Sequence, residues 1–177
     1  FWGCRILTSQ YAYEMSVRKV LPKLGVRLAD LGEALCCGDP VKSINDFAAT
    51  YLSARIVALA NSTGLDHLLV PCNRCHFVIS EAKKAVENNE EISHKIDGLL
   101  KEEALEYDPN VKIWHVIDLL HDFVGLEKIK STVKKPLKGL KLASHVGCQI
   151  IRYNDVGRVD DAENPRKLDE LIGALGA

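Results

Sequence analysis

Apolar residues recur at a helical spacing in several parts of the chain. The clearest pattern spans residues 45–63, where Asn45 is a suitable N-cap. Its apolar stripe consists of Phe47, Tyr51, Leu52, Ile56 and Leu59. The same spacing predicts a helix over residues 9–25, frayed at Pro22 and ended by Gly25. Helices are therefore expected to make up much of the first half of the chain.

Further helical patterns follow towards the C-terminus. Residues 77–89 and 113–125 are amphipathic, and each is predicted to form one helix. The charged segment 90–110 is predicted to be a solvated helical excursion. A last helix is expected in the tail, with Asn164 as its N-cap and Pro165 at its first position.

Three segments have the character of β-strands. Residues 26–31 (VRLADL) are predicted to form a short strand, and residues 67–71 (HLLVP) form a continuous apolar run typical of a strand buried on both faces. A third strand is expected from residue 140 towards Gly147. Strands separated by helices favour parallel pairing, so the predicted fold class is α/β with a layered parallel sheet.

The chain also contains an internal similarity. FWGC at residues 1–4 and HVGC at residues 145–148 look like the openings of two repeats about 144 residues apart. We therefore expect a first repeat over residues 1–130, a polar linker over residues 131–139, and the start of a second repeat over residues 140–177. On this interpretation the chain is a fragment of a longer protein that also lacks a short leading strand.

Composition and charge exclude several classes. Of the 177 residues, 47% are apolar and 27% are charged, which is typical of a globular domain. The net charge of −1 provides no basic surface for nucleic acid or an anionic membrane, and no apolar run is long enough for a spanning helix. Since neither a GxGxxG nor a Walker motif occurs, any flavin or nicotinamide cofactor is expected in a partner.

The cysteines indicate metal or redox chemistry. Two are adjacent in LCCGDP and two form a CxxC in PCNRC. Such clustering in a chain with a sizeable core is typical of a reducing compartment, so we expect a cytoplasmic protein. The six cysteines are Cys4, Cys36, Cys37, Cys72, Cys75 and Cys148.

The first five of these cysteines follow the ends of expected strands, which in a parallel sheet meet at one edge. Helices beginning just after Cys4 and Cys75 would stabilise thiolates there. Five thiolates repel one another without a metal, and tetrahedral zinc needs only four, so an iron–sulfur unit fits better. Zinc bound by four cysteines, buried free thiols or disulfides, and a thioredoxin-like CxxC remain alternatives.

These motifs resemble the cysteine-rich CCG domain of the heterodisulfide reductase B-type subunit family. The resemblance rests on FWGC, ALCCGDP, VPCNRCHF, HVGCQIIRY, the spacing C-x31-CC-x34-CxxC and the tail DDAENPRKLDELIGALGA. It covers essentially the whole chain. It implies a Rossmann-like layered domain with a second, pseudo-symmetric repeat.

The resemblance also implies a noncubane [4Fe–4S] cluster, in which adjacent cysteines serve neighbouring irons. The positions that match the ligands of this first cluster are Cys4, Cys36, Cys37, Cys72 and Cys75. Cys148 matches the first ligand of a second cluster, which is incomplete here. In protein prepared in air, zinc or an empty site is the alternative.

The resemblance implies an iron–sulfur oxidoreductase subunit that reduces a disulfide, such as the CoB-CoM heterodisulfide of methanogenesis. The expected partners are an iron–sulfur subunit of the C type, a flavin subunit of the A type and a thiol or disulfide substrate. The isolated fragment is expected to be inactive. The alternatives are a CCG-domain electron-transfer subunit in sulfur, lactate or succinate metabolism, and a zinc-stabilised scaffold without catalysis.

Several other residues are candidates for lining the substrate site. They are His76, His145, Arg74 and Arg152. Arginines close to cysteines, Arg5 included, could offset thiolate charge or hold anionic groups of a substrate. By contrast, His115 and His121 lie on an apolar segment and are expected to be partly buried structural residues.

Overall fold

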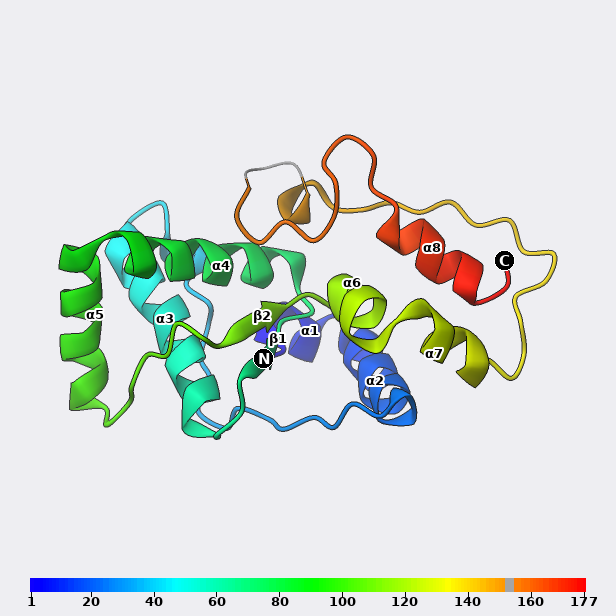
Figure 1. Cartoon of the computed structure of the whole chain (residues 1–177). Helices are drawn as coiled ribbons and strands as arrows, with labels where there is room; N and C mark the ends of the chain where they lie inside the picture. Colours follow the sequence, from blue (N-terminus) through cyan, green and yellow to red (C-terminus); the bar gives the residue numbers. More distant parts are fainter. Residues whose placement is uncertain (152–154) are drawn as a thin grey trace.

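The computed structural model describes residues 1–151 and 155–177, and helices dominate it (Figure 1). The first half contains helices α1 (Gly3–Thr8) and α2 (Tyr11–Val20), the 3-10 turns η1 (Leu21–Leu24) and η2 (Asp39–Val41), helix α3 (Asp46–Ser62) and strand β1 (His67–Leu69). Then follow α4 (Asn73–Asn88), α5 (Glu90–Glu102), strand β2 (Lys112–Trp114), α6 (Val116–Asp118), the π-helical turn η3 (Leu119–Val124), α7 (Leu126–Thr132), η4 (Cys148–Ile150) and α8 (Lys167–Ala174).

The two strands form a small parallel sheet in the middle of the molecule (Figure 1). His67 pairs with Lys112 and Leu69 with Trp114. The connection between the strands runs through α4 and α5, because parallel strands need a long crossover. The chain is thus a mixed helical protein with a parallel sheet, which confirms the α/β prediction at this coarse level.

Local signals predicted the first helices correctly. Helix α3 begins at Asp46, where the Asn45 side chain accepts a hydrogen bond from the Ala48 N–H at 3.0 Å. The predicted fraying at Pro22 is confirmed, because α2 gives way to the 3-10 turn η1. Gly25 ends this turn in the left-handed conformation, with φ of 87°.

The predicted strand at residues 26–31 is wrong, since this segment joins no ladder within the described part of the chain. Its apolar side chains still pack: Leu28 contacts the cluster around α2, and Leu31 the central core. A strand forms only as part of a ladder, so a strand-like pattern that lacks a hydrogen-bonded neighbour remains irregular.

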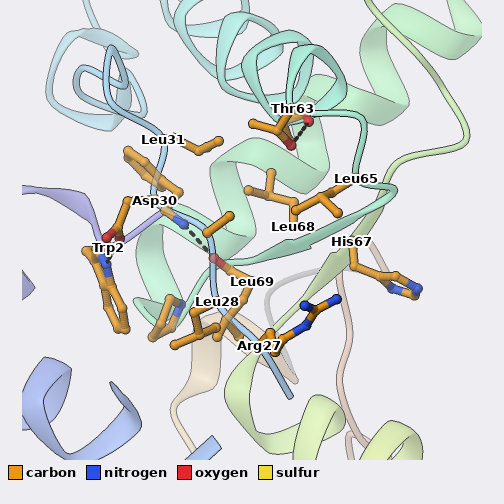
Figure 2. A pocket seen from close by; sticks show the side chains of 14 residues that line it. Trp2, Arg27, Leu28, Asp30, Leu31, Thr63, Leu65, His67, Leu68 and Leu69 are labelled. Atoms are coloured by element: carbon orange, nitrogen blue, oxygen red, sulfur yellow. Dashed lines mark hydrogen bonds between the residues drawn. The ribbon is translucent and has the colours of Figure 1, made fainter. Parts of the chain in front are cut away.

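A cavity of about 70 Å³ lies between this segment and β1 (Figure 2). The first two residues bridge the two sides. The Phe1 amine donates to the Leu69 carbonyl at 2.8 Å, and the Trp2 indole N–H donates to Asp30 at 3.1 Å (Figure 2). Segment 26–31 is therefore attached to the sheet through side chains and the N-terminus.

Two further predicted elements differ from the structure. The single helix over residues 113–125 is wrong at its start, because Lys112–Trp114 pair with β1 and the helical backbone begins only at Val116. The strand expected from residue 140 is also wrong, since the described segment 140–147 is irregular. For residues 112–114, the pairing with the remote strand β1 decides the outcome.

The segment 90–110 is a helix at its start, as predicted, but it is not merely solvated. Helix α5 buries Ile96 and Leu100 in a cluster with Ala54 and Ala58 of α3 and Val86 of α4. Its charged residues face outward while this apolar stripe closes one side of the core. The prediction of a fully solvated excursion is therefore wrong.

The tail helix begins later than predicted, at Lys167 rather than Pro165. The backbone N–H groups at its start bond to a residue earlier in the chain. The Asp160 carboxylate accepts from the N–H of Arg166 at 2.8 Å and from that of Lys167 at 2.7 Å. The expected cap residue, Asn164, lies outside the helix.

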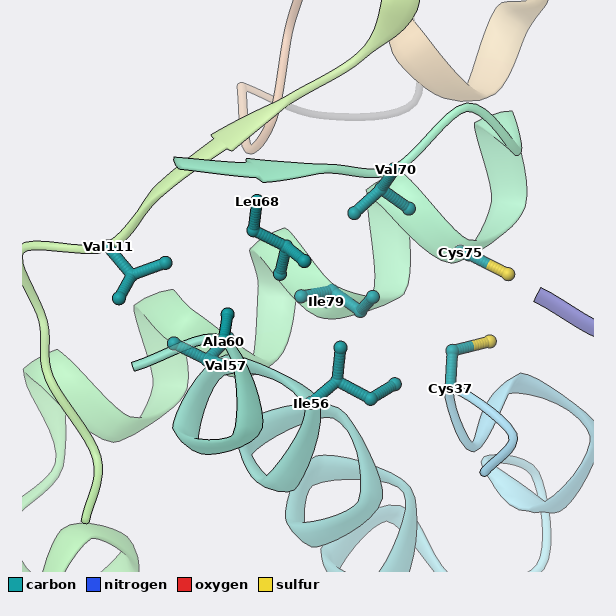
Figure 3. Close-up of a cluster of buried hydrophobic side chains, with 9 residues drawn as sticks. All are labelled: Cys37, Ile56, Val57, Ala60, Leu68, Val70, Cys75, Ile79 and Val111. Carbon is teal, nitrogen blue, oxygen red and sulfur yellow. The ribbon is translucent and has the colours of Figure 1, made fainter. Parts of the chain in front are cut away.

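The central core lies between β1, α3 and α4 (Figure 3). Its buried members are Cys37, Ile56, Val57, Ala60, Leu68, Val70, Cys75, Ile79 and Val111. Two of the nine are cysteines, so the edge of the core is also the place where thiols gather.

Candidate metal centre

Three separate segments carry the first five cysteines. Cys4 lies in the first turn of α1, and Cys36 and Cys37 lie in the loop before η2. Cys72 is the N-cap residue of α4, and Cys75 lies in its first turn. All five therefore occupy turns or helix beginnings, where the backbone can aim a side chain at a common point.

The expectation that helices begin just after Cys4 and Cys75 is wrong by a few residues. Helix α1 begins at Gly3 and α4 at Asn73, so both cysteines belong to the helices themselves. Cys72 caps the start of α4, where the backbone N–H groups of Arg74 and Cys75 help to lower the pKa of its thiol.

The thiols of two of these segments converge, whereas the Cys4 side chain on α1 is exposed. Cys37 and Cys75 belong to one buried cluster, and Cys36 and Cys72 pack against it. Figure 3 shows the Cys37 and Cys75 sulfur atoms at the same end of the cluster. A Cβ added at Gly3 would lie 2.8 Å from the Cys75 sulfur, so the α1 backbone rests directly on this thiol.

The thiols interact electrostatically. Hydrogen bonding from the Cys75 thiol lowers the pKa of Cys37 to about 7 and that of Cys72 to about 6. The same hydrogen bonds raise the pKa of Cys75, while burial raises the pKa of Cys36. Without a metal, the Cys37 and Cys72 thiolates are thus stabilised by the protonated Cys75 thiol. A bound metal would compete with the Cys75 proton.

The loop of the adjacent cysteines is locked against α3. Gly38 has φ of 92°, and a Cβ there would lie 2.7 Å from the Ala49 backbone. The Ser53 hydroxyl donates to the Cys37 carbonyl at 2.5 Å. Glycine is needed at position 38 both for its conformation and for this close approach.

The donor set fits a sulfur-rich cluster in chemical terms. Four thiols from two segments lie at one edge of the core, the exposed Cys4 acts electrostatically on Cys36, and soft thiolates are the ligands that iron–sulfur units require. Gly3 leaves space for the Cys75 sulfur that any side chain would fill. Among residues 1–151 and 155–177, no three His, Cys, Asp or Glu side chains are already arranged around a single metal position.

A groove of about 590 Å³ opens beside the cysteines. It is lined by Arg5, Gln10, Ala12, Tyr13, Pro71, Cys72, Asn73, Arg74 and Gln149. Arg74 is exposed and donates to the Asp39 carboxylate at 2.5 Å. Arg74 thus lies in the wall of the groove with its guanidinium paired to an acid, and its role toward a substrate stays a prediction.

The predicted histidines have different environments. His76 is buried, and within the described residues its Nδ1 has no hydrogen-bond partner. Burial lowers its pKa to about 3. His145 is exposed, and Arg152 lies outside the described residues.

The segment of Cys148 approaches the CxxC motif. Gln149 lines the groove, and a Cβ at Gly147 would collide with the Asn73 amide nitrogen. The Cys148 side chain itself is exposed. The structure thus brings the HVGC segment to the groove but leaves its thiol outside the buried group.

Sequence reasoning assigned no role at the site to His115. It is buried, as expected, but its imidazole reaches Pro71 and Asn73, the neighbours of Cys72. In the sequence, His115 directly follows the apolar residues Ile113 and Trp114. This pattern alone does not indicate the contact.

The comparisons identify the class of protein first. Residues 1–80, which contain all five clustered cysteines, match the family described as CCG, cysteine-rich domain. This match confirms the resemblance inferred from the motifs.

Relatives extend the similarity over the whole chain. The chain is 34% identical over 181 residues to a protein of Archaeoglobus profundus that is described as like the B-type subunit of heterodisulfide reductase. It is 33% identical over 179 residues to the B-type subunit of the ferredoxin/F(420)H(2)-dependent CoB-CoM heterodisulfide reductase of Methanosarcina acetivorans. The 8-methylmenaquinol:fumarate reductase membrane anchor subunit of Wolinella succinogenes is 28% identical over 179 residues.

All of this chain aligns with each of these proteins, but it covers only 60%, 59% and 61% of their respective lengths. The chain therefore spans about three fifths of the curated relatives it matches. None of the helices in residues 1–151 and 155–177 has the length and hydropathy needed to cross a bilayer.

Proposed function

We propose that this chain is part of an iron–sulfur oxidoreductase subunit of the heterodisulfide reductase B type. The observation that carries the proposal is the convergence of four cysteines from two segments at one edge of the core, with the α1 backbone against the Cys75 thiol and an open groove beside Cys72. The names of the Archaeoglobus and Methanosarcina relatives support the same activity.

The proposed cofactor is a noncubane [4Fe–4S] cluster, which when bound would supply one-electron chemistry next to the sulfur of a substrate. Its proposed ligands are Cys4, Cys36, Cys37, Cys72 and Cys75. Cys148 would be the first ligand of a second cluster. In this proposal Gly3 lets the α1 backbone approach the Cys75 thiol, and Gly38 lets the CCG loop approach α3.

The groove is the proposed substrate site, since Cys72 lies in its wall. Arg5 and Arg74 give it positive charge, and Asp39 orients the Arg74 guanidinium. Such a site favours a thiol or disulfide that carries an anionic group. His76 and His145, with Arg152 outside the described residues, remain candidates for contacting the substrate.

Reduction of a disulfide to two thiols takes two electrons and two protons. We propose that the electrons arrive through an iron–sulfur partner of the C type from a flavin partner of the A type, in the cytoplasm. Residues 1–130 would form one Rossmann-like CCG repeat, joined by the linker 131–139 to a second, pseudo-symmetric repeat beginning at residue 140. The 177 residues alone would then be inactive.

The similarity to the Wolinella subunit favours one alternative, a CCG-domain electron-transfer subunit of an oxidoreductase with another substrate. A zinc-stabilised scaffold without catalysis is the other. Zinc takes four ligands and tolerates the loss of a fifth thiol, whereas the proposed cluster does not.

The test is to measure iron, acid-labile sulfide and zinc per chain after anaerobic reconstitution. The proposal predicts about four iron and four sulfide. Cys37→Ala should lose most of the iron, while Cys148→Ala, which lies outside the group of five, should keep it. One zinc without sulfide, or unchanged metal in Cys37→Ala, would overturn the proposal.

A further inference from the structure

One buried imidazole holds both neighbours of Cys72. The His115 Nε2 lies 3.0 Å from the carbonyl oxygen of Pro71 and 2.9 Å from the side-chain oxygen of Asn73. Pro71 comes directly before Cys72 and Asn73 directly after it. The side chain of His115 therefore connects the two residues that flank Cys72.

The contacts define the tautomer. A carbonyl oxygen only accepts hydrogen bonds, so the His115 Nε2 must carry the proton that it shares between Pro71 and Asn73. The other ring nitrogen, Nδ1, accepts from the Ile117 N–H at 3.3 Å and caps α6. Both nitrogens of the neutral ring are thus satisfied, and burial keeps it neutral by lowering its pKa to about 4.

Other hydrogen bonds also hold this segment, since the Cys72 carbonyl accepts from the His76 N–H at 2.8 Å. The Tyr13 hydroxyl also approaches the Pro71 carbonyl, at the longer distance of 3.5 Å. Only 3% of the His115 surface is exposed, so water cannot readily replace its hydrogen bonds. His115 therefore adds, from a different element, a buried link between the Pro71 carbonyl and the Asn73 side chain.

The same amide extends the link to the second cysteine segment. Asn73 accepts from His115 through its oxygen, and its nitrogen faces Gly147, where a Cβ would collide with it. Gly147 comes directly before Cys148. The contacts run from His115 through Asn73 to the segment that carries Cys148.

We propose that His115 is a positioning residue that holds Cys72 in place through its Nε2–H and, through Asn73, sets the approach of the Cys148 segment. Iron binding by Cys72 rests on the proposed function, whereas the effect of His115 on the position of the Cys72 thiol does not. Residues that orient metal ligands from outside typically change metal affinity by about 10- to 100-fold.

The test compares His115→Asn with His115→Gln. Asparagine retains an acceptor for capping α6 but cannot reach Pro71, whereas glutamine places an N–H near the position of Nε2. In reduced, metal-free protein, alkylation of each cysteine by iodoacetamide is followed by mass spectrometry. We expect Cys72 to react about tenfold faster in His115→Asn, with Cys37 and Cys75 unchanged and His115→Gln close to the parent protein.

A second measurement follows the loss of iron to a chelator from reconstituted protein. His115→Asn should lose iron about tenfold faster, and His115→Gln should restore most of the retention. The exposed His94 on α5 provides the matched control, His94→Asn, which should change neither readout. Absence of iron in the parent protein would refute the proposed function and leave the alkylation result to decide this inference.

Three results would overturn the inference. These are an unchanged Cys72 rate in His115→Asn, an equal rise at all buried thiols, and a failure of His115→Gln to restore the parent rate. If His115→Asn does not fold, Asn73→Ala takes its place, because it removes one of the two acceptors. It should then give a smaller increase confined to Cys72, and no increase would equally refute the proposal.

Discussion

Substitution of Gly38 by alanine should destabilise the CCG loop in two ways, through its backbone conformation and through a steric clash. Gly38 has φ of 92°, a region that costs an L-residue about 1–2 kcal/mol. In addition, the new Cβ would lie 2.7 Å from the Cα and carbonyl oxygen of Ala49, which are backbone atoms of a buried helix. Relief of that contact by a backbone shift adds about 1–3 kcal/mol.

We therefore expect Gly38→Ala to lower the free energy of unfolding by about 2–5 kcal/mol, a large part of the about 5–15 kcal/mol of a typical domain. The matched control is Gly25→Ala. Gly25 has φ of 87° but nothing within 4 Å of its added Cβ, so only the conformational cost of about 1–2 kcal/mol applies. The difference between the two variants measures the contact with α3.

The assay is urea denaturation of the reduced, metal-free protein, followed by circular dichroism, with the slope checked for constancy. If both variants lose the same stability, the CCG loop does not press on α3 in solution, and the packing argument for Gly38 is refuted. A larger loss in Gly38→Ala should be accompanied by weaker iron binding, because the loop carries two proposed ligands.

The remaining predictions concern stability and are measured in the same way. Asn45→Ala should cost about 1 kcal/mol through loss of the Ala48 hydrogen bond, and no loss would mean that α3 does not depend on its cap. Ile96→Ala should cost about 3 kcal/mol because Ile96 is fully buried, whereas Ile44→Ala, at an 86% exposed site, should cost almost nothing; equal costs would refute the burial of α5. The pKa of His115 is lowered to about 4, so the unfolded chain takes up this proton first as the pH falls. The stability from neutral His115 is complete above about pH 6.5 and should fall by about 2 kcal/mol by pH 5; this part of the slope should vanish in His115→Gln, and an unchanged slope would contradict it.

Many features of the site could be predicted from the sequence. The adjacent cysteines, the CxxC and their spacing identified the CCG domain, because these motifs are short and their chemistry is distinctive. Arg74, a candidate for lining a substrate site, lies in the wall of the groove, and its role stays a prediction. Its ion pair with Asp39 was not predictable, since the two residues lie 35 positions apart and meet only when η2 approaches α4.

The His115 contact illustrates the same limit. A histidine next to an apolar run predicts burial, and the burial is confirmed. Its two acceptors lie more than 40 positions earlier in the chain, and only the placement of β2 beside β1 brings them within reach. The sequence pattern carries no signal for that pairing.

The sequence by itself determined the helices whose signals are local. Asn45 begins α3, and Pro22 with Gly25 ends the α2 region, because caps and turns depend on residues a few positions apart. Only the tertiary structure decided which strand-like segments became strands. Residues 26–31 have a suitable pattern and stay irregular, while Ile113 and Trp114 lie in an expected helix and belong to β2, because a strand requires hydrogen bonds from a partner that is remote in the chain. The gathering of the cysteines has the same origin, since each segment supplies its thiols locally and the packing of α1, α3 and α4 brings them together.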